Sequence, residues 1–427
     1  MELTDKKGVV VSKAFVIAWA VGLLFYFLVY VIRSCPAVMI GPLADHFATS
    51  AVGVSSIAGS YYYTYAVTSL LAGMALDHFG GKYPISAGLI MLAAGSFLFI
   101  FPTAAAGYTG RLLQGAGSAF GFTGCVYLAT HGFASRFTAT AIGITQCIGM
   151  FGGSAGQFAV GHIIKGIDVQ TFWGLTGAIC TLTCAMLFLA SPKEDTSGSA
   201  NNSFNSLLHP FQIVFANGQS YLCGLIAGLL FAPTTIFVMT WGVAFFQKDL
   251  GFDYDSAVLT CSMTPLGWVL GCPLLGWISD RLNKRKAVLV ASITIMLLTF
   301  AQIVYLPLLL PVQLSMLLFG IASGCAMIPY SMIKEANPAE VKGSATGAMN
   351  FLTFSVTAVI GPLFGQYLGK TLDITTGHAA HFKLTGMVII ALMIFALLAS
   401  FIIRETAHSD EQAPNPLKLS VEHETLS

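Results

Sequence analysis

Two arginines interrupt long apolar runs and are the first candidates for binding chemistry. Arg33 ends the run that begins at Ala14, and Arg111 precedes another run in which Gln114 follows about one turn later. A charge within a bilayer-spanning helix costs roughly 2.5–3.5 kcal/mol on insertion scales, so it usually marks a functional pathway. With no acidic residue opposite, both guanidinium groups favour a ligand that carries a carboxylate. The alternative for Arg33 is that its side chain reaches the headgroups at the membrane surface.

Tyrosines cluster on the same runs. Tyr26 and Tyr30 share one helical face with Trp19 and Arg33. The stretch "SYYYTYA" at Ser60–Ala66 holds four tyrosines in five positions. Their hydroxyl groups each need a hydrogen-bonding partner inside a membrane, so they cannot all face lipid. The tyrosines of this stretch that we expect to line a polar path are Tyr61, Tyr62 and Tyr65.

Further polar side chains recur at helical spacing on later runs. We select four of them as candidate ligand-binding residues: Gln146, Trp241, Thr264 and Asn350. Each alone is also explained as a hydrogen-bonding contact between packed helices. Together with the tyrosines they predict a hydrated seam. No Asp or Glu lies in the middle of an apolar run, since Asp77, Asp280 and Glu335 all fall near run ends.

Motifs for catalysis, metal binding and cofactors are weak in this chain. The "GGSAG" at Gly152–Gly156 has the G-x-S-x-G form of a hydrolase nucleophile, but it lies inside an apolar run and not after a strand. The "HAAH" at His378–His381 supplies two histidines, which is short of a ligand set. The nine cysteines form no CxxC pair, and the sequence contains no Walker lysine motif. We therefore predict no enzyme activity, no metal and no cofactor.

The elements that position these residues must be membrane-spanning helices. Of the 427 residues 56% are hydrophobic and 9% are charged, against about 25% charged in soluble domains. A net charge of +1 without a basic patch excludes nucleic acid as a partner. Runs of about 20 apolar residues can cross a bilayer. The chain yields twelve of them, within 14–32, 51–76, 83–110, 112–130, 137–161, 169–191, 219–246, 256–279, 287–333 (two spans), 343–369 and 384–403.

Loop charges predict the orientation of these spans. Most lysines and arginines fall in the loops on one side, whereas Lys165, Lys248, Lys370 and Lys383 fall on the other. Because basic loops stay in the cytoplasm, we expect both termini to be cytoplasmic. We expect the membrane to be a bacterial inner membrane.

One loop occurs twice. "GMALDHFGGK" contains Gly73, Asp77, Gly80 and Lys82, and "GWISDRLNKR" repeats the spacing 203 residues later, after the second span of each half. An offset of nearly half the chain indicates an internal duplication. The residues of the second copy that we expect to act in the same way are Gly276, Asp280, Arg281 and Arg285.

The pattern G-x-x-x-D-x-x-G-x-[KR] resembles the signature loop of the major facilitator superfamily. "GRLLQGAG" at Gly110–Gly117 is similar to a second motif of that family, and the resemblance covers almost the whole chain. It implies two six-helix halves with a substrate site between them at the bilayer midplane. It also implies that the two loops latch the cytoplasmic side, while in many relatives the arginine at the position of Arg111 is structural or gating. The tyrosine cluster resembles a subgroup of phagosomal-type nutrient, oxalate/formate-like and lysosomal dipeptide transporters.

These observations lead to one expected architecture and function. We predict an all-α membrane protein with a six-helix bundle at 1–191, a cytoplasmic linker at 192–218, a second bundle at 219–403 and a polar tail at 404–427. We expect it to carry small carboxylate-bearing solutes (an organic anion, amino acid or dipeptide) by alternating access.

Three alternatives to this function stay open. One is a proton-coupled symporter, against which the lack of a mid-span acid weighs. The others are an exporter of another small solute and a non-transporting receptor or scaffold on the same fold. A proton or counter-substrate is a further expected partner. We also expect Arg33→Ala or Arg111→Ala to abolish flux without loss of expression.

Overall fold

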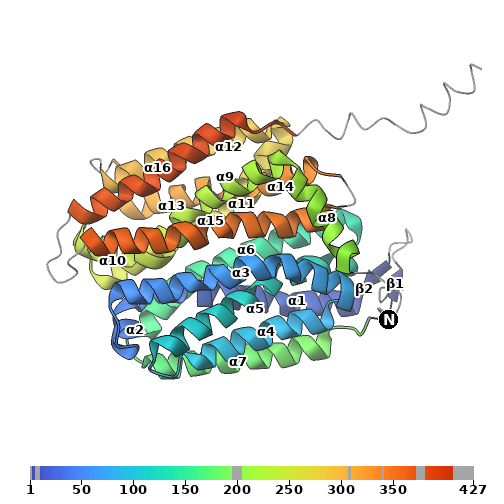
Figure 1. Ribbon diagram of the computed structural model, residues 1–427, viewed down its shortest axis with the longest axis horizontal. Coiled ribbons are helices and arrows are strands. Elements are labelled where there is room, and N and C mark those ends of the chain that lie inside the picture. The colour runs from blue at the N-terminus through green and yellow to red at the C-terminus, as the bar shows by residue number, and fades with distance from the viewer. Residues whose placement is uncertain are drawn as a thin grey trace, which may run out of the picture.

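Two bundles of long helices make up the chain. The computed structural model describes residues 2–4, 10–194, 204–305, 309–338, 341–371 and 380–406. In Figure 1 the helices of the N-terminal half lie below those of the C-terminal half, with their axes roughly along the long dimension. The predicted all-α architecture is confirmed. The small exception is a two-stranded antiparallel pair ahead of the first helix, β1 (Glu2–Thr4) with β2 (Val10–Ser12).

The N-terminal half contains six long helices. Its elements are α1 (Lys13–Ser34), η1 (Cys35–Val38), α2 (Ile40–His46), α3 (Ala51–Phe79), α4 (Lys82–Leu98), α5 (Ala104–Gly132), α6 (Ser135–Ile163) and α7 (Val169–Ala190). Polar side chains begin several of them: Ser50, Thr103 and Asp168 each accept a hydrogen bond from a backbone N–H of the first turn. The stretch "FPTAAAG" (Phe101–Gly107) contains the connection between α4 and α5.

The C-terminal half repeats this plan with two interrupted segments. Its elements are α9 (Gly218–Ala232), η2 (Pro233–Trp241), α10 (Gly242–Lys248), α11 (Tyr254–Leu282), α12 (Arg285–Val304), α13 (Val312–Ser323), η3 (Gly324–Met327), α14 (Ile328–Glu335), α15 (Lys342–Thr371) and α16 (Ala380–Ile402). Here α9, η2 and α10 form one long segment, and α13, η3 and α14 form another. Within the described residues, seven helical segments are long enough and apolar enough, by length and by composition, to cross a membrane.

The predicted linker is partly helical. Within 192–218 the structure forms α8 (Phe204–Ala216), and residues 195–203 lie outside the described part. Phe211 and Val214 of α8 are buried, and α8 packs against α15. Phe211 and Val214 are three residues apart, so they lie on the same, apolar face of α8. The composition of this segment had predicted a solvated linker. The division into two bundles at 191 and 219 stays a prediction, and most of the predicted tail also falls outside the described residues.

Small residues allow the helices to approach closely. A Cβ on Gly115 of α5 would lie 2.1 Å from the carbonyl oxygen of Tyr61 on α3. In the second half, a Cβ on Gly320 of α13 would lie 2.1 Å from the carbonyl oxygen of Thr264 on α11. Such backbone contact is typical of membrane bundles, where van der Waals packing holds helices together.

Each repeated loop leaves its helix through a residue with positive φ. Gly80 has φ +72° directly after α3, and Asn283 has φ +50° directly after α11. Gly and Asn are the residues that tolerate this left-handed region best. The two turns are not the same, however, because ψ is −179° at Gly80 and 41° at Asn283.

The two halves meet along a few helices. Helix α3 packs against α15, α6 packs against α11, and α1 contacts η2. In Figure 1, α3 and α15 lie next to each other across the middle of the molecule, and α8 lies at the same end as the N-terminus. Most predicted site residues therefore lie on elements at the interface between the halves, namely α1, α3, α6, η2, α11 and α15. Arg111 and Gln114 lie on α5.

Candidate functional site

Arg33 lies inside a cage of aromatic rings, which we call the Arg33 cage. Its guanidinium carbon is 4.6 Å from the ring centre of Tyr30 and 4.8 Å from that of Tyr65. The remaining rings lie at 5.1–5.9 Å: Tyr61, Tyr62 and Phe354. All are within cation–π range. Phe354 belongs to α15, so the cage closes across both halves of the molecule.

The charge of Arg33 is buried without a counter-ion. Its side chain is 3% exposed, and its Nε and Nη2 donate to the hydroxyl oxygen of Tyr61 at 3.3 and 3.2 Å. Among the described ion pairs none involves Arg33. An unpaired buried charge is costly, and aromatic faces compensate for part of that cost. The arrangement therefore leaves Arg33 able to attract an anion.

A small central pocket adjoins the cage. The residues that line it are Tyr26, Tyr30, Tyr65, Phe122, Gln146, Phe231, Met327, Tyr330, Asn350 and Phe354. Tyr26 donates to Gln146 Oε1 at 3.2 Å, and Tyr330 donates to Asn350 Oδ1 at 2.8 Å. Asn350 is 3% exposed, and its Nδ2 has no hydrogen-bonding partner in the structure. A buried N–H without a partner is costly, so this amide is available to donate to a group placed in the central pocket.

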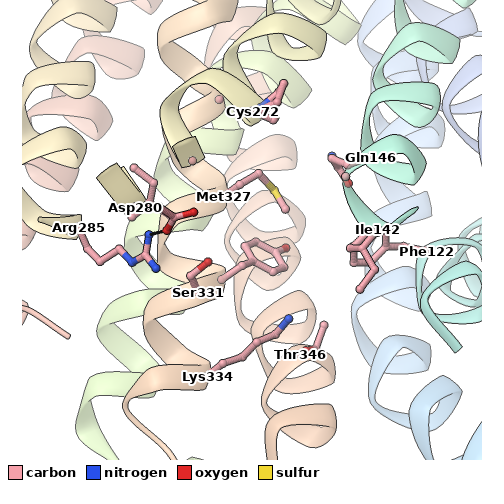
Figure 2. Close-up of a pocket in the computed structure, with 16 residues that line it drawn as sticks. Phe122, Ile142, Gln146, Cys272, Asp280, Arg285, Met327, Ser331, Lys334 and Thr346 are labelled. Carbon is pink, nitrogen blue, oxygen red and sulfur yellow. Dashed lines mark hydrogen bonds and ion pairs between the residues drawn. The ribbon is translucent and has the colours of Figure 1, made fainter. Parts of the chain in front are cut away.

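The central pocket is the inner end of a larger cavity of about 310 Å³. Phe122, Gln146, Met327 and Tyr330 line both. The large cavity continues to the second repeated loop, where Asp280 and Arg285 line it (Figure 2). In Figure 2, Phe122, Ile142 and Gln146 face the residues of the C-terminal half across the cavity. The cavity thus lies between the two halves and opens at the end that carries the repeated loops.

The opposite end is closed by contacts between the halves. Tyr254 at the start of α11 donates to the Val38 carbonyl oxygen at 2.6 Å. Lys165, just after α6, forms an ion pair with Asp255 of α11, and His162 lies 3.6 Å from the same carboxylate. Helix α11 begins at the closed end, with Tyr254 and Asp255, and ends at the open end, beside the Asp280 loop.

Arg111 and Gln114 do not line the central pocket or the large cavity. Arg111 is 1% exposed and donates to the carbonyl oxygens of Ile32 and Ala58 at 3.0 and 3.3 Å. It also donates to Gln114 Oε1 at 3.0 Å, and Gln114 in turn donates to Ser96. These bonds join α1, α3, α4 and α5. These hydrogen bonds favour a packing role for both residues, although Arg111 Nε has no partner and the guanidinium lies over the Tyr61 ring at 4.9 Å. Their assignment to ligand binding stays a prediction.

Two further candidates lie away from the cavity. Thr264 donates to the Met316 carbonyl oxygen inside the C-terminal bundle. Trp241 lines a separate small pocket toward the closed end, together with Tyr62 and Thr357. Thr264 and Trp241 were selected because they lie on polar faces of their helices. Helical spacing does not distinguish a polar face that lines a cavity from one that packs against a neighbouring helix.

The two repeated loops differ in their ion pairs. Arg285 forms an ion pair with Asp280 and with Glu335 at 2.8 Å, and Arg281 lies over the Trp277 ring. In the first loop the Lys82 ammonium lies 4.4 Å from the ring centre of Phe188. Asp77 and Lys82 form no pair with each other among the described ion pairs.

The glycines of the two loops also lie near the cavities between the halves. Gly276 lines the large cavity, whereas Gly73 and Asp77 line a second cavity of about 310 Å³ beside α8. That second cavity also includes His131 of α5 and Phe211 of α8.

Sequence reasoning missed several lining residues. Phe354 completes the Arg33 cage, Tyr330 holds Asn350, and Lys334 lines the large cavity. Lys334 ends a charge-free run and was counted as an ordinary cytoplasmic loop charge. The available signal was its spacing, because Tyr330 and Lys334 are four residues apart and share a helical face.

The fold and site define a class of protein: a multi-pass membrane protein with a polar cavity between two helical bundles. Comparison with known proteins makes this specific. The model of the Major Facilitator Superfamily matches residues 22–362, and the chain belongs to this family of transporters.

Known relatives and solved structures agree with that family. The inner membrane metabolite transport protein YhjE of Escherichia coli (strain K12) is 26% identical over 185 residues, which span 42% of this chain and 40% of the relative. The crystal structure of the nucleoside transporter NupG has a TM-score of 0.69 at 16% identity, covering 92% of this chain and 99% of NupG. A bacterial homologue of the human lysosomal transporter Spinster, inward-facing and unoccupied, has a TM-score of 0.69 at 14% identity, covering 94% and 99%.

Proposed function

We propose that this transporter carries small carboxylate-bearing solutes, such as an organic anion, an amino acid or a dipeptide, by alternating access. The observation that carries the proposal is the buried Arg33 guanidinium without a carboxylate partner. A substrate carboxylate would supply the missing counter-charge, and the unpartnered Asn350 amide at the adjoining pocket would donate a further hydrogen bond.

Sidedness follows from the open and closed ends. With both termini in the cytoplasm, the large cavity opens inward and the Tyr254–Val38 and Lys165–Asp255 contacts close the outer side. The Asp77 and Asp280 loops then act as cytoplasmic latches that engage when the halves rock toward the outward-open state. We place the protein in the inner membrane of a bacterium, as YhjE is an inner membrane protein.

Coupling to protons is not required by this site. The residues that line the central pocket include no Asp or Glu. A buried carboxylate is the usual proton relay in carriers, so uniport or exchange for a counter-substrate is the mode we propose.

The first experiment is thermal stabilisation of the purified protein by amino acids, dipeptides, mono- and dicarboxylates, and nucleosides at two pH values. A ligand at a hundredfold excess over its Kd stabilises the folded state by about 2.7 kcal/mol. We expect a carboxylate-bearing solute to raise Tm independently of pH. We also expect Arg33→Gln to abolish that shift. Stabilisation by nucleosides alone would overturn the proposal and favour a neutral planar substrate stacked on the aromatic lining.

A further inference from the structure

Lys334 is the feature of the large cavity that the proposed substrate site leaves unexplained. It lies near the end of α14 and lines the cavity together with Met327, Tyr330 and Ser331. Their spacing places these residues on one face of the helix, which is the face turned to the cavity. Figure 2 shows the Lys334 side chain extending from α14 toward the cavity side of Thr346.

The other charged groups at this end of the large cavity are bound to one another. Asp280 and Arg285 are paired, and Arg285 also binds Glu335. Lys334 forms no ion pair with any described carboxylate. Lys342, at the start of α15, lies near enough for the two like charges to interact. Lys334, Lys342 and Arg285 together carry +3 and Asp280 and Glu335 carry −2, so this group has a net charge of +1. An anion placed beside Lys334 would relieve its repulsion with Lys342.

Neutral groups for anion binding surround the ammonium. The hydroxyl groups of Ser331 and Thr346 line the same cavity. Tyr330, one helical turn of about 5.4 Å further in, bonds to Asn350 at the central pocket. A chain of donors therefore leads from the Arg33 cage through Asn350 to Lys334, from the enclosed end of the cavity toward its open end.

We propose that Lys334 is a second anion-binding point, which receives the substrate carboxylate between the Arg33 cage and the open end of the cavity. This inference rests on the proposed function and adds a specificity to it. Substrates with a net negative charge are favoured over zwitterions, because the Lys334 ammonium attracts the carboxylate of a zwitterion but repels its ammonium group. For solutes long enough to reach both cations, two carboxylates are favoured over one.

The test uses pyridoxal 5′-phosphate, an anionic aldehyde that labels lysines, on the purified full chain, followed by borohydride reduction and peptide mass spectrometry. The internal control is Lys284, which is exposed in the loop before α12 and lies outside the cavity lining. We expect labelling of Lys334 to saturate with reagent concentration and to be suppressed by excess succinate. Labelling of Lys284 should rise linearly and ignore succinate. Linear, unprotected labelling of Lys334, or none, overturns the proposal.

A second arm separates this inference from the proposed function. Lys334→Gln should weaken thermal stabilisation by succinate, glutamate or alanylalanine about tenfold, since a hydrogen bond to a charged group is lost. Lys334→Arg should retain stabilisation, and Lys284→Gln should match the wild type. If none of these acids stabilises the wild type while Lys334 labelling still saturates, the carboxylate-transport proposal fails and the anion-binding point stands. Wild-type affinity in Lys334→Gln contradicts the role of Lys334 in substrate binding.

Discussion

Replacing Arg111 by lysine distinguishes a structural role from a ligand-binding role. Arg111 donates to the carbonyl oxygens of Ile32 and Ala58 and to Gln114, so its planar fork joins three helices from a position that is 1% exposed. A lysine keeps the charge but presents one ammonium at the end of a flexible chain. It can reach one of these three acceptors, and the hydrogen bonds to the other two are lost.

The expected loss of stability follows from those two acceptors. A buried group left unpaired costs about 1–3 kcal/mol, which bounds the effect at about 2–6 kcal/mol. Hydrogen bonds between membrane helices average about 0.6 kcal/mol, because the unfolded chain in the membrane also finds partners. We therefore expect a loss near the low end, about 2 kcal/mol, equivalent to a roughly thirtyfold smaller ratio of folded to unfolded protein.

The assay is the melting of purified protein followed with a thiol-reactive dye, since buried free cysteines such as Cys35 and Cys125 become reactive on unfolding. Arg33→Lys is the matched control, because Arg33 donates only to the Tyr61 hydroxyl among its described hydrogen bonds. We expect Arg111→Lys to lower Tm clearly more than Arg33→Lys, and Arg33→Lys to lose carboxylate binding at nearly unchanged Tm. Arg111→Lys with a wild-type Tm and no substrate binding would refute this assignment and return Arg111 to the binding site.

Three further substitutions test other parts of the structure. Gly115→Val should cost about 1–3 kcal/mol by overpacking, since a Cβ there lies 2.1 Å from the Tyr61 carbonyl oxygen, and should lower Tm. Asn350→Asp keeps the oxygen that accepts from Tyr330 but replaces the unpartnered amide donor with a negatively charged oxygen, which repels a carboxylate. Stabilisation by carboxylates should therefore disappear while the variant is still expressed. Asp255→Asn should favour the outward-open state at most about fivefold, because an exposed pair contributes about 0–1 kcal/mol, measured as faster maleimide labelling of a cysteine placed at Ser55.

Each of these predictions has a result that contradicts it. Wild-type melting of Gly115→Val would mean that α3 and α5 are farther apart than described. Retained carboxylate stabilisation in Asn350→Asp would place the substrate away from the central pocket. Unchanged labelling in Asp255→Asn at low salt, where screening is weakest, would mean that the Lys165–Asp255 ion pair does not help to close the outer side.

The sequence alone predicted the class of fold well. Apolar run lengths located the long helices, and the repeated loop predicted the duplication, because both depend on local composition and spacing. It failed for α8, where a short amphipathic helix lies inside a segment rich in Ser and Asn. Helix formation there depends on burial of Phe211 and Val214 against α15, which is a tertiary contact.

The candidate site was predicted in part. Arg33, Tyr30 and Tyr65 were selected on helical spacing, and the structure brings the three side chains together. Tyr30 and Tyr65 line the central pocket with Asn350, and Arg33 lies behind these two rings. The same reasoning selected Arg111, whose two Nη atoms donate to acceptors within the N-terminal bundle while its Nε has no partner. Residue type cannot separate the two arginines, because both are buried cations on apolar helices.

What distinguishes them is which helix lies opposite each side chain. Sequence determines that a helix spans the membrane and which residues share a face, because rise and twist per residue are constant. It does not determine whether that face meets backbone carbonyls of its own bundle, as at Arg111, or aromatic rings of both halves, as at Arg33. The same holds for Lys334, which became a cavity residue only when α14 was packed with its Tyr330 face toward the interface between the halves.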